Sequence, residues 1–279
     1  ATGLLSRYLK EEKNCSVVGV EISEEALKQA SPYLSLPVLC DIESGEWKEA
    51  VKDMRFDSII FGDVLEHLRF PHNALRDAAA FLKKDGKVLF SVPNLAHGDV
   101  LLKLIDGRFD YTPLGILDDT HIHFFGKDNL PEICAEAGLF LAELTGTMVP
   151  MGSTEQKSEA SSADLAFIKN KPYSHIYQFV GVAYRMDYAH EKGMVRNERL
   201  PVYSGVNRVF FDTGEGLCDK NAITFTCENP LKIHKEFPLP PHTVHLRLDP
   251  CDEGTFYYKN VHFRTDSGDL SPTAIDHAA

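Results

Sequence analysis

The sequence has no hydrophobic run approaching the roughly 20 residues that a membrane-spanning helix needs. It also has no excess of basic residues, because 29 Lys and Arg stand against 41 Asp and Glu, for a formal net charge of −12. A nucleic-acid-binding protein needs a basic surface to neutralise phosphates, so this balance argues against that class. We therefore expect neither a transmembrane segment nor a nucleic-acid partner.

Cysteines are few and scattered. None of them forms a CxxC pair: Cys15, Cys40, Cys134, Cys218, Cys227 and Cys251. A structural zinc site needs closely spaced ligands, so we expect no metal site here. Unpaired, reduced thiols are typical of cytosolic proteins, and we predict a cytoplasmic location.

Strand-like and helix-like segments alternate over the first half of the chain. Apolar strands are predicted at 16–21, 37–41, 56–63 and 87–94. Helices are predicted at 3–12, 23–30, 45–54 and 71–86, with Ser23 as an N-cap, Pro71 at a helix start and Gly86 at a helix end. This order indicates an α/β fold, a parallel sheet covered by helices on both faces.

The pattern loosens after Asn94. We predict a helix over 97–109, an irregular loop over 110–125 and a helix over 127–138 that Gly138 closes. The segments 139–149 and 174–186 read as two paired edge strands, and the polar, Ser-rich stretch 151–164 between them as mobile. From about residue 195, short alternating segments divided by Pro, Gly, Asn and Asp indicate an antiparallel β-sandwich. The predicted domains are therefore 1–190 and 195–279.

Acidic residues stand at the ends of three predicted strands, and they follow a glycine near the start of the chain. Glu21 follows Gly3 by eighteen residues, Asp41 ends the next strand and Asp63 the third. In a nucleotide-binding βαβ unit, an acid about 20 residues past the glycine turn accepts hydrogen bonds from ribose hydroxyls. Because ligands of open α/β folds bind at the carboxyl edge of the sheet, these positions favour a nucleotide site over simple turn caps.

The segments "ATGLLSRYL", "VVGVEIS", "CDIES", "FDSIIFGDVLEHLRFP" and "LKKDGKVLFSVPN" resemble, in order, the motifs of class I S-adenosylmethionine-dependent methyltransferases, which have a Rossmann-like sheet. The resemblance covers roughly 1–187. "GDVLEHL" resembles ubiquinone-biosynthesis-type O-methyltransferases. "SVPNLAHGDVLLKLIDGRFDYTPLGILDDTHIHFF" resembles bacterial methyltransferases found beside or fused to glycosyltransferases of surface-polysaccharide synthesis, and the last 85 or so residues, about 195–279, resemble accessory β-domains of such proteins.

The resemblance implies S-adenosylmethionine as cofactor and assigns residues to it. The methionine part would contact the end of a glycine-rich loop, Ala1, Thr2 and Gly3. Glu21 would bind the ribose, with Ile22 beside the adenine. The adenine pair would be Asp41 and Ile42, and the methionyl end would be lined by Gly62, Asp63 and Val64.

The front of the family pattern is not in the chain. The family begins with an apolar strand ending in an acid, followed by two glycines, and these do not precede Ala1. In the family this strand lies between the strands predicted here at 16–21 and 56–63. Its loss would leave unpaired backbone groups that cost about 1–3 kcal/mol each when buried. We therefore expect an N-terminally truncated chain.

Methyl transfer to a hydroxyl benefits from a general base, most often His. "DDTHIHFF" offers His121 and His123, which would share one face if the stretch is extended. We predict His121 as base or substrate ligand, and a structural loop histidine is the alternative. The same cluster could instead hold a divalent metal, and Tyr111, Phe124 and Phe125 could wall the acceptor pocket or simply belong to the core. His67, in the "GDVLEHL" motif, could be functional or merely half-buried.

The function expected from the resemblance is O-methylation of a sugar in surface-polysaccharide biosynthesis. Its acceptor would be a small molecule or glycan, and a glycosyltransferase a possible partner. Two alternatives stay open: a ubiquinone-type small-molecule O-methyltransferase, and a degenerate methyltransferase with a β-sandwich that binds a glycan or glycosyltransferase.

Overall fold

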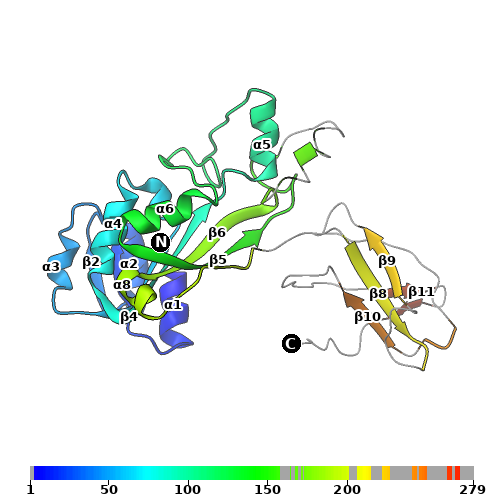
Figure 1. Ribbon diagram of the computed structural model, residues 1–279, viewed down its shortest axis with the longest axis horizontal. Helices are drawn as coiled ribbons and strands as arrows, with labels where there is room; N and C mark the ends of the chain where they lie inside the picture. Colours follow the sequence, from blue (N-terminus) through cyan, green and yellow to red (C-terminus); the bar gives the residue numbers. More distant parts are fainter. Residues whose placement is uncertain are drawn as a thin grey trace. The chain divides into compact units, whose positions relative to one another are not determined.

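The computed structural model describes most of the first 200 residues and several strands of the remainder. These residues are 3–157, 164, 167–168, 171, 173–200, 206–214, 222–226, 241–243, 245–249, 263–265 and 268–270. The chain divides into two compact units, Ala1–Leu200 and Pro201–Ala279, and each has its own sheets (Figure 1).

The first unit begins with helices around a small parallel sheet. Its elements are α1 (Leu4–Glu11), β1 (Val18–Glu21), α2 (Glu24–Ala30), the 3-10 helix η1 (Ser31–Tyr33) and β2 (Leu36–Leu39). β1 and β2 pair in parallel, as predicted. The backbone N–H of Ala26 donates to Oγ of Ser23 at 3.3 Å, which confirms Ser23 as the N-cap of α2.

The main sheet has five strands in the order β3-β4-β6-β5-β7. They are β3 (Phe56–Gly62), β4 (Leu82–Pro93), β5 (Leu139–Met148), β6 (Ile176–Arg185) and β7 (Asn197–Glu198). β3 and β4 are parallel, whereas β6 runs antiparallel to both β4 and β5. The sheet is therefore mixed rather than parallel throughout.

The prediction of an edge pair at 139–149 and 174–186 is wrong in one respect. The two segments do pair, but neither is an edge strand, because β6 lies between β4 and β5, and β5 lies between β6 and the short β7. Gly181 of β6 stands opposite Phe90 of β4, and a Cβ at Gly181 would come within 2.3 Å of Cζ of Phe90. The close approach of the aromatic ring thus requires glycine at this position.

The helix predicted over 71–86 is shorter than expected. α4 (Pro71–Ala79) begins at Pro71, but the chain then enters β4. Phe56 pairs with Leu82 and Ser58 with Lys87, so the residues between Leu82 and Lys87 bulge out of the ladder. The prediction failed because the partner strand, 26 residues away, extends β4 into a segment whose local composition suits a helix end.

Five further helices can be given bounds within the described part of the first unit. They are α3 (Trp47–Ala50), the 3-10 helix η2 (Leu65–His67), α5 (Gly98–Ile105), α6 (Asn129–Glu136) and α8 (Met186–Glu191). α6 is followed by Gly138 with φ 74°, as the predicted helix stop requires. Buried residues of the main sheet and its helices form one core, and Val18 and Val20 of β1 pack against it. The two sheets thus share their hydrophobic core.

β1 and β3 each have a strand partner on one side only within the part of the chain that the structure describes. β1 pairs with β2, and β3 pairs with β4. In the family that the sequence resembles, one more strand lies between these two. That strand does not precede Ala1 in this sequence. The interruption between the two sheets therefore lies at the predicted position.

The second unit is built from short antiparallel strands where it is described. β8 (Val206–Asp212) lies between β9 (Ala222–Thr226) and β10 (His245–Asp249), and β11 (Phe263–Thr265) pairs with β12 (Gly268–Leu270). The strand expected at 231–239 lies outside the described residues, and the sandwich stays a prediction. β7 pairs with β5, so residues 197–198 belong to the first unit rather than to the second.

No helix among the described residues is both long and apolar enough to cross a membrane.

Candidate active site

Gly3 opens α1 at the end of the predicted cofactor loop. Its φ of 83° lies in the left-handed region, and a Cβ there would come within 2.7 Å of Cα of Ala30. Both facts favour glycine, because other residues are strained at this φ and would collide with α2. Ala1 and Thr2, the other predicted loop residues, lie outside the described residues.

Glu21 and Asp41 lie at the carboxyl ends of neighbouring parallel strands. Oε1 of Glu21 accepts a hydrogen bond from the backbone N–H of Ser23 at 3.0 Å, and Oδ1 of Asp41 accepts one from the N–H of Glu43 at 2.9 Å. The backbone N–H of Cys40 donates to the carbonyl oxygen of Glu21, which ties the two strand ends together. Both acids therefore sit at one edge of the small sheet.

The apolar residues beside these acids differ in their surroundings. Ile22 is 70% exposed, so its side chain is accessible to an adenine ring that approaches from solvent. Ile42 packs against the hydrophobic core, and its carbonyl accepts a hydrogen bond from Nε1 of Trp47 at 3.0 Å. Ile22 is thus the more accessible of the two predicted adenine neighbours.

The segment Gly62–Val64 leaves the carboxyl end of β3, and Asp63 is held there in an unusual conformation. Its φ is 52°, which is uncommon for a residue other than glycine. Its Oδ1 accepts hydrogen bonds from Oγ of Ser91 at 3.0 Å and from Nε2 of Gln178. A Cβ on Gly62 would meet nothing within 4 Å, so this strand end is open to a ligand.

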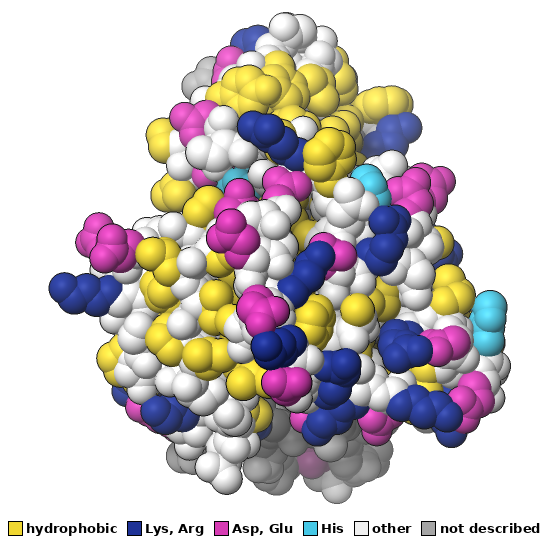
Figure 2. Space-filling view, turned by 90° about the vertical axis from the view of Figure 1, so that its left-hand side faces the viewer, with side chains coloured by type: hydrophobic (Ala, Val, Ile, Leu, Met, Phe, Trp, Pro, Cys, Tyr) yellow, Lys and Arg dark blue, Asp and Glu magenta, His cyan; other side chains and the backbone are white. Residues whose placement is uncertain are grey.

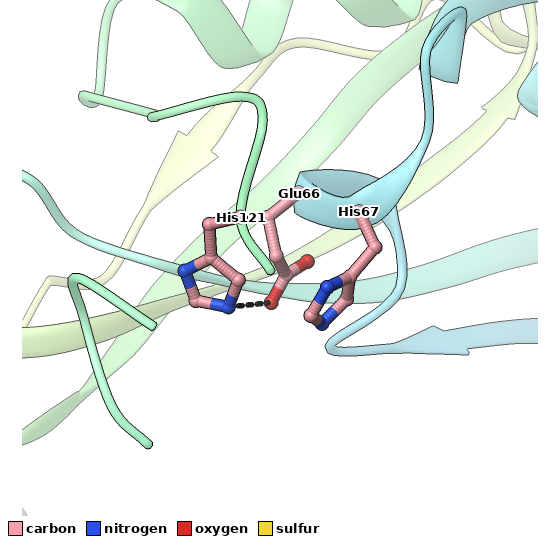
Figure 3. A group of neighbouring side chains, drawn as sticks. All are labelled: Glu66, His67 and His121. Atoms are coloured by element: carbon pink, nitrogen blue, oxygen red, sulfur yellow. Dashed lines mark ion pairs between the residues drawn. The ribbon is translucent and has the colours of Figure 1, made fainter. Parts of the chain in front are cut away.

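Directly after this segment, η2 presents Glu66 and His67 to His121 of the 110–125 loop (Figure 3). One ligand-type atom from each side chain lies within 4.8 Å of the others. Nε2 of His121 is 4.0 Å from Oε1 of Glu66, and the two imidazole rings lie 4.7 Å apart, edge to face. We call these three residues the histidine cluster.

Backbone hydrogen bonds assemble the histidine cluster across 55 residues of sequence. The carbonyl oxygen of Glu66 accepts from the N–H groups of Ile122 and His123, at 2.9 and 3.0 Å. Nδ1 of His121 lies 3.1 Å from the carbonyl oxygen of Ile116, and that contact requires the ring to donate. The loop is thus anchored to η2 directly after His121, and the His121 ring is held by the loop's own backbone.

Glu66 is the electrostatic centre of the cluster. Its side chain is 1% exposed, and neither carboxylate oxygen has a hydrogen-bond partner among the described residues. Burial raises the pKa of Glu66 to about 8, backbone hydrogen bonding opposes this, and the negative charges of Asp63 and Asp118 add to it. Burial thus disfavours the ionised form of the Glu66 side chain, and the imidazole of His121 is the ring that lies 4.0 Å from it.

His123, the second predicted catalytic residue, is not brought into the cluster. Its Nε2 lies 3.2 Å from the carbonyl oxygen of Arg69, and its ring stacks on Phe125. The expectation that His121 and His123 share a face assumed an extended stretch. Instead, the backbone N–H of His121 donates to the carbonyl oxygen of Asp118, which closes a turn. The two rings consequently have different neighbours.

The aromatic residues predicted near the acceptor divide in the same way. Phe125 is 5% exposed and belongs to the core. Phe124 lies 6.4 Å from the ring of His121 and 5.9 Å from Phe109, which in turn contacts Tyr111. Three aromatic rings therefore extend from the histidine cluster toward the surface, and Phe125 is not among them.

That surface is apolar. Figure 2 shows hydrophobic side chains gathered at the top of the molecule, over α5 and the segment that follows it. The exposed hydrophobic residues of this region are Leu104, Ile105, Phe109, Tyr111 and Leu114. The histidine cluster is consequently bordered by polar strand ends on one side and by an apolar rim on the other.

A sequence model of the family described as "Methyltransferase domain" matches residues 1–144, just over half of the chain. The chain belongs to this family. Membership of this family confirms the prediction of a methyltransferase domain and supports S-adenosylmethionine as its cofactor.

Curated relatives of this methyltransferase domain include the "Ubiquinone biosynthesis O-methyltransferase" of Azoarcus sp., 29% identical over 52% of this chain and 63% of the relative. The protein of the same name from Thiobacillus denitrificans is 30% identical over 47% of this chain and 58% of the relative. The chain thus spans less than two thirds of these relatives. Among solved structures, a SAM-dependent methyltransferase from Archaeoglobus fulgidus has 15% identity and a TM-score of 0.44, covering 63% of this chain and 78% of that one.

The residues present fit S-adenosylmethionine by the chemistry of their side chains. The carboxylates of Glu21 and Asp41 can accept hydrogen bonds from hydroxyl and amino groups, and the exposed Ile22 offers an apolar surface beside them. Asp63 carries a negative charge at an open strand end, where a positively charged amino group can bind. When bound, the cofactor supplies an activated methyl group.

Sequence reasoning missed Glu66, Ser91 and Gln178. Glu66 stands beside His67 in the "GDVLEHL" motif, but a glutamate in a charged segment is usually solvent-exposed. Ser91 and Gln178 lie within strands, and only the pairing of the strands brings them to Asp63. The motif itself was the one available signal.

Proposed function

We propose that this methyltransferase domain transfers the methyl group of S-adenosylmethionine to a sugar hydroxyl in a surface polysaccharide or its activated precursor. The observation that carries the proposal is the position of the histidine cluster directly after the cofactor-lining segment Gly62–Val64. Methyl donor and hydroxyl-handling groups would then meet at one strand end. We further propose that the reaction takes place in the cytoplasm.

The reaction is an in-line displacement. The acceptor oxygen attacks the methyl carbon, the carbon–sulfur bond breaks, and its electron pair stays on sulfur to give S-adenosylhomocysteine. The hydroxyl proton must leave as the new bond forms. The protein's task is to align the two reactants and exclude water, and the histidine cluster, with His121 as base or acceptor ligand, helps to remove the proton.

The sugar acceptor rests on the resemblance of the stretch from Ser91 to Phe125 to methyltransferases found with glycosyltransferases. That stretch forms α5, the loop bearing His121 and the apolar rim. The second unit would supply the contact to a glycan or glycosyltransferase. The names of the curated relatives favour a second candidate, a ubiquinone-type small-molecule O-methyltransferase.

Two experiments test these proposals in the full-length protein. Calorimetric titration with S-adenosylhomocysteine should show one saturable site, and an absence of binding would favour the alternative of a degenerate binding module. Methyl transfer from labelled S-adenosylmethionine is then assayed with nucleotide sugars, lipid-linked glycans and catechol-type quinone precursors. Labelling of sugars supports the polysaccharide role, and labelling of the phenols alone overturns it in favour of the second candidate.

A further inference from the structure

The histidine cluster contains a buried carboxyl group that lacks a hydrogen-bond partner among the described residues. Glu66 is 1% exposed, and both of its oxygens are without a hydrogen bond in the described part of the chain. Burying a carboxylate in this state is costly, so native proteins pair such groups with a cation, a donor or a metal ion. Nε2 of His121 is 4.0 Å from Oε1 of Glu66, beyond hydrogen-bond distance.

The neighbouring hydrogen bonds orient both imidazoles. Nδ1 of His121 donates to the carbonyl of Ile116, which leaves a lone pair on Nε2, the atom that faces Glu66. Around His67, the hydroxyl of Thr120 donates to Asp118 at 2.6 Å, so Thr120 Oγ1 can only accept from Nδ1 of His67, 3.1 Å away. Both rings therefore carry their proton on Nδ1 and keep Nε2 as a lone-pair donor.

This arrangement is the usual setting of metal-binding histidines. In such sites one ring nitrogen binds the ion while the other donates to a carbonyl or to a carboxylate-linked group. The Asp118–Thr120–His67 chain and the Ile116–His121 contact supply those outer hydrogen bonds. Figure 3 shows the two rings on either side of the Glu66 carboxylate.

We propose that Glu66, His67 and His121 bind one divalent first-row transition-metal ion, with Zn²⁺ as the reference metal. Two imidazoles and one carboxylate form a ligand set of this class and leave a position open. Ligand atoms around tetrahedral Zn²⁺ are about 3.4 Å apart, given bonds of about 2.1 Å, and here one ligand-type atom from each of the three side chains lies within 4.8 Å of the others. Because His67 is exposed, its ring has room to turn inward and close this difference.

The role of the ion rests on the proposed function, although its binding does not. The open position would face the acceptor beside the cofactor-lining segment. A bound cation there would coordinate the acceptor hydroxyl and lower its pKa, so that the proton passes to water while the oxygen attacks the methyl carbon. His121 would then act as a ligand of the ion rather than as the base.

The test measures binding of the metal alone to the full chain, stripped beforehand with a chelator. Titration calorimetry with Zn²⁺ should show one saturable site per chain, weakened at least 100-fold in Glu66→Gln and in His121→Asn. Mg²⁺, which prefers oxygen ligands, should give no comparable binding. His190→Asn, a substitution of an exposed histidine in α8, is the matched control and should leave the affinity unchanged.

Co²⁺ absorption separates the proposed site from adventitious cysteine binding. The proposed ligands give a visible d–d spectrum without a thiolate charge-transfer band. Circular dichroism checks that each variant is folded, and His67→Asn, altered at an exposed position, gives a second ligand variant that should also bind Zn²⁺ more weakly. Absence of saturable Zn²⁺ binding, unchanged affinity in the folded ligand variants, or a thiolate band would overturn the site. Binding of S-adenosylhomocysteine in the same samples reports on the proposed function separately.

Discussion

Nε2 of His97 lies 2.8 Å from the carbonyl oxygen of Val149, while Nδ1 of the same ring accepts a hydrogen bond from the backbone N–H of Asp99. His97 is fully buried and is the N-cap of α5. Its two contacts are compatible only with a neutral ring that carries its proton on Nε2. A second proton, on Nδ1, would meet the N–H of Asp99 and break the cap.

The first prediction is a pH-dependent contribution of His97 to stability. Burial lowers the pKa of His97 below its ordinary value near 6.5, so the unfolded chain takes up the proton first. The stabilisation by neutral His97 is therefore fully present above about pH 6.5, and it is lost as the pH falls from there through the pKa of His97 in the folded protein. The free energy of unfolding falls by no more than about 1.4 kcal/mol per pH unit in this window.

Urea unfolding of the wild type and of His97→Gln between pH 5 and 8 measures this effect. We expect the variant to be less stable by about 1–3 kcal/mol at neutral pH, and the gap to narrow toward acid. His190→Gln, at an exposed histidine of α8, serves as the control. A gap that stays constant over the whole range would contradict the neutral, buried state of His97.

The second prediction concerns Asp99, which fastens residues 152–154 to α5. Its carboxylate accepts hydrogen bonds from the N–H of Gly152 at 2.6 Å and from the N–H and hydroxyl of Thr154 at 3.2 and 2.6 Å. Asp99→Ala leaves these donors unpaired in a buried place, and we expect a loss of about 2–4 kcal/mol in the free energy of unfolding.

Asp106→Ala is the matched control, because Asp106 lies just after α5 in an exposed pair with Arg108. Its loss should stay within about 0.5 kcal/mol. Equal losses in the two variants would show that the buried hydrogen bonds of Asp99 contribute no more to stability than an exposed ion pair does. Hydrogen exchange of the Gly152 and Thr154 amides gives a local readout, and both should exchange faster in Asp99→Ala.

This anchor also shows where sequence reasoning reaches its limit. The stretch from Met151 was predicted to be mobile because it is polar and Ser-rich, yet Thr154 and Gln156 are buried. Nζ of the buried Lys103 donates to Oε1 of Gln156 at 2.9 Å. Polar side chains form a buried network here because the fold brings together partners that are about 50 residues apart in the sequence. Composition alone cannot predict such contacts.

Local signals, by contrast, predicted well. The Ser23 cap, the Pro71 helix start and the Gly138 helix end depend on contacts within one turn of the chain, and all three were confirmed. The same distinction runs through the candidate site. The strand-end acids could be placed from spacing alone, whereas the pairing of Glu66 with His121 depends on a loop that returns after 55 residues.

The third prediction separates the two histidines proposed for catalysis. His121→Asn should lower kcat of methyl transfer by about 10²–10⁴-fold, because it removes the group that lies within 4.0 Å of Glu66, whether that group is a proton acceptor or a ligand. His123→Asn should change kcat by less than about tenfold, because His123 contacts Arg69 and Phe125 instead. Steady-state kinetics with labelled S-adenosylmethionine measure both, and the reverse order of effects would place the acceptor on the Arg69 side.

The fourth prediction addresses the cofactor edge. Because Glu21 ends β1 with its carboxylate turned back over the start of α2, Glu21→Ala should remove a charge-assisted hydrogen bond to the ribose and weaken S-adenosylhomocysteine binding about 10- to 100-fold. Glu24→Ala, three residues further along in the first turn of α2, changes the same net charge without touching the strand end, and should leave the affinity within about twofold. Calorimetry on the full-length protein compares them, and the decisive quantity is the difference between the two variants. Equal weakening would mean that the acid at the end of β1 acts through net charge only, and the assignment of the ribose to Glu21 would then be wrong.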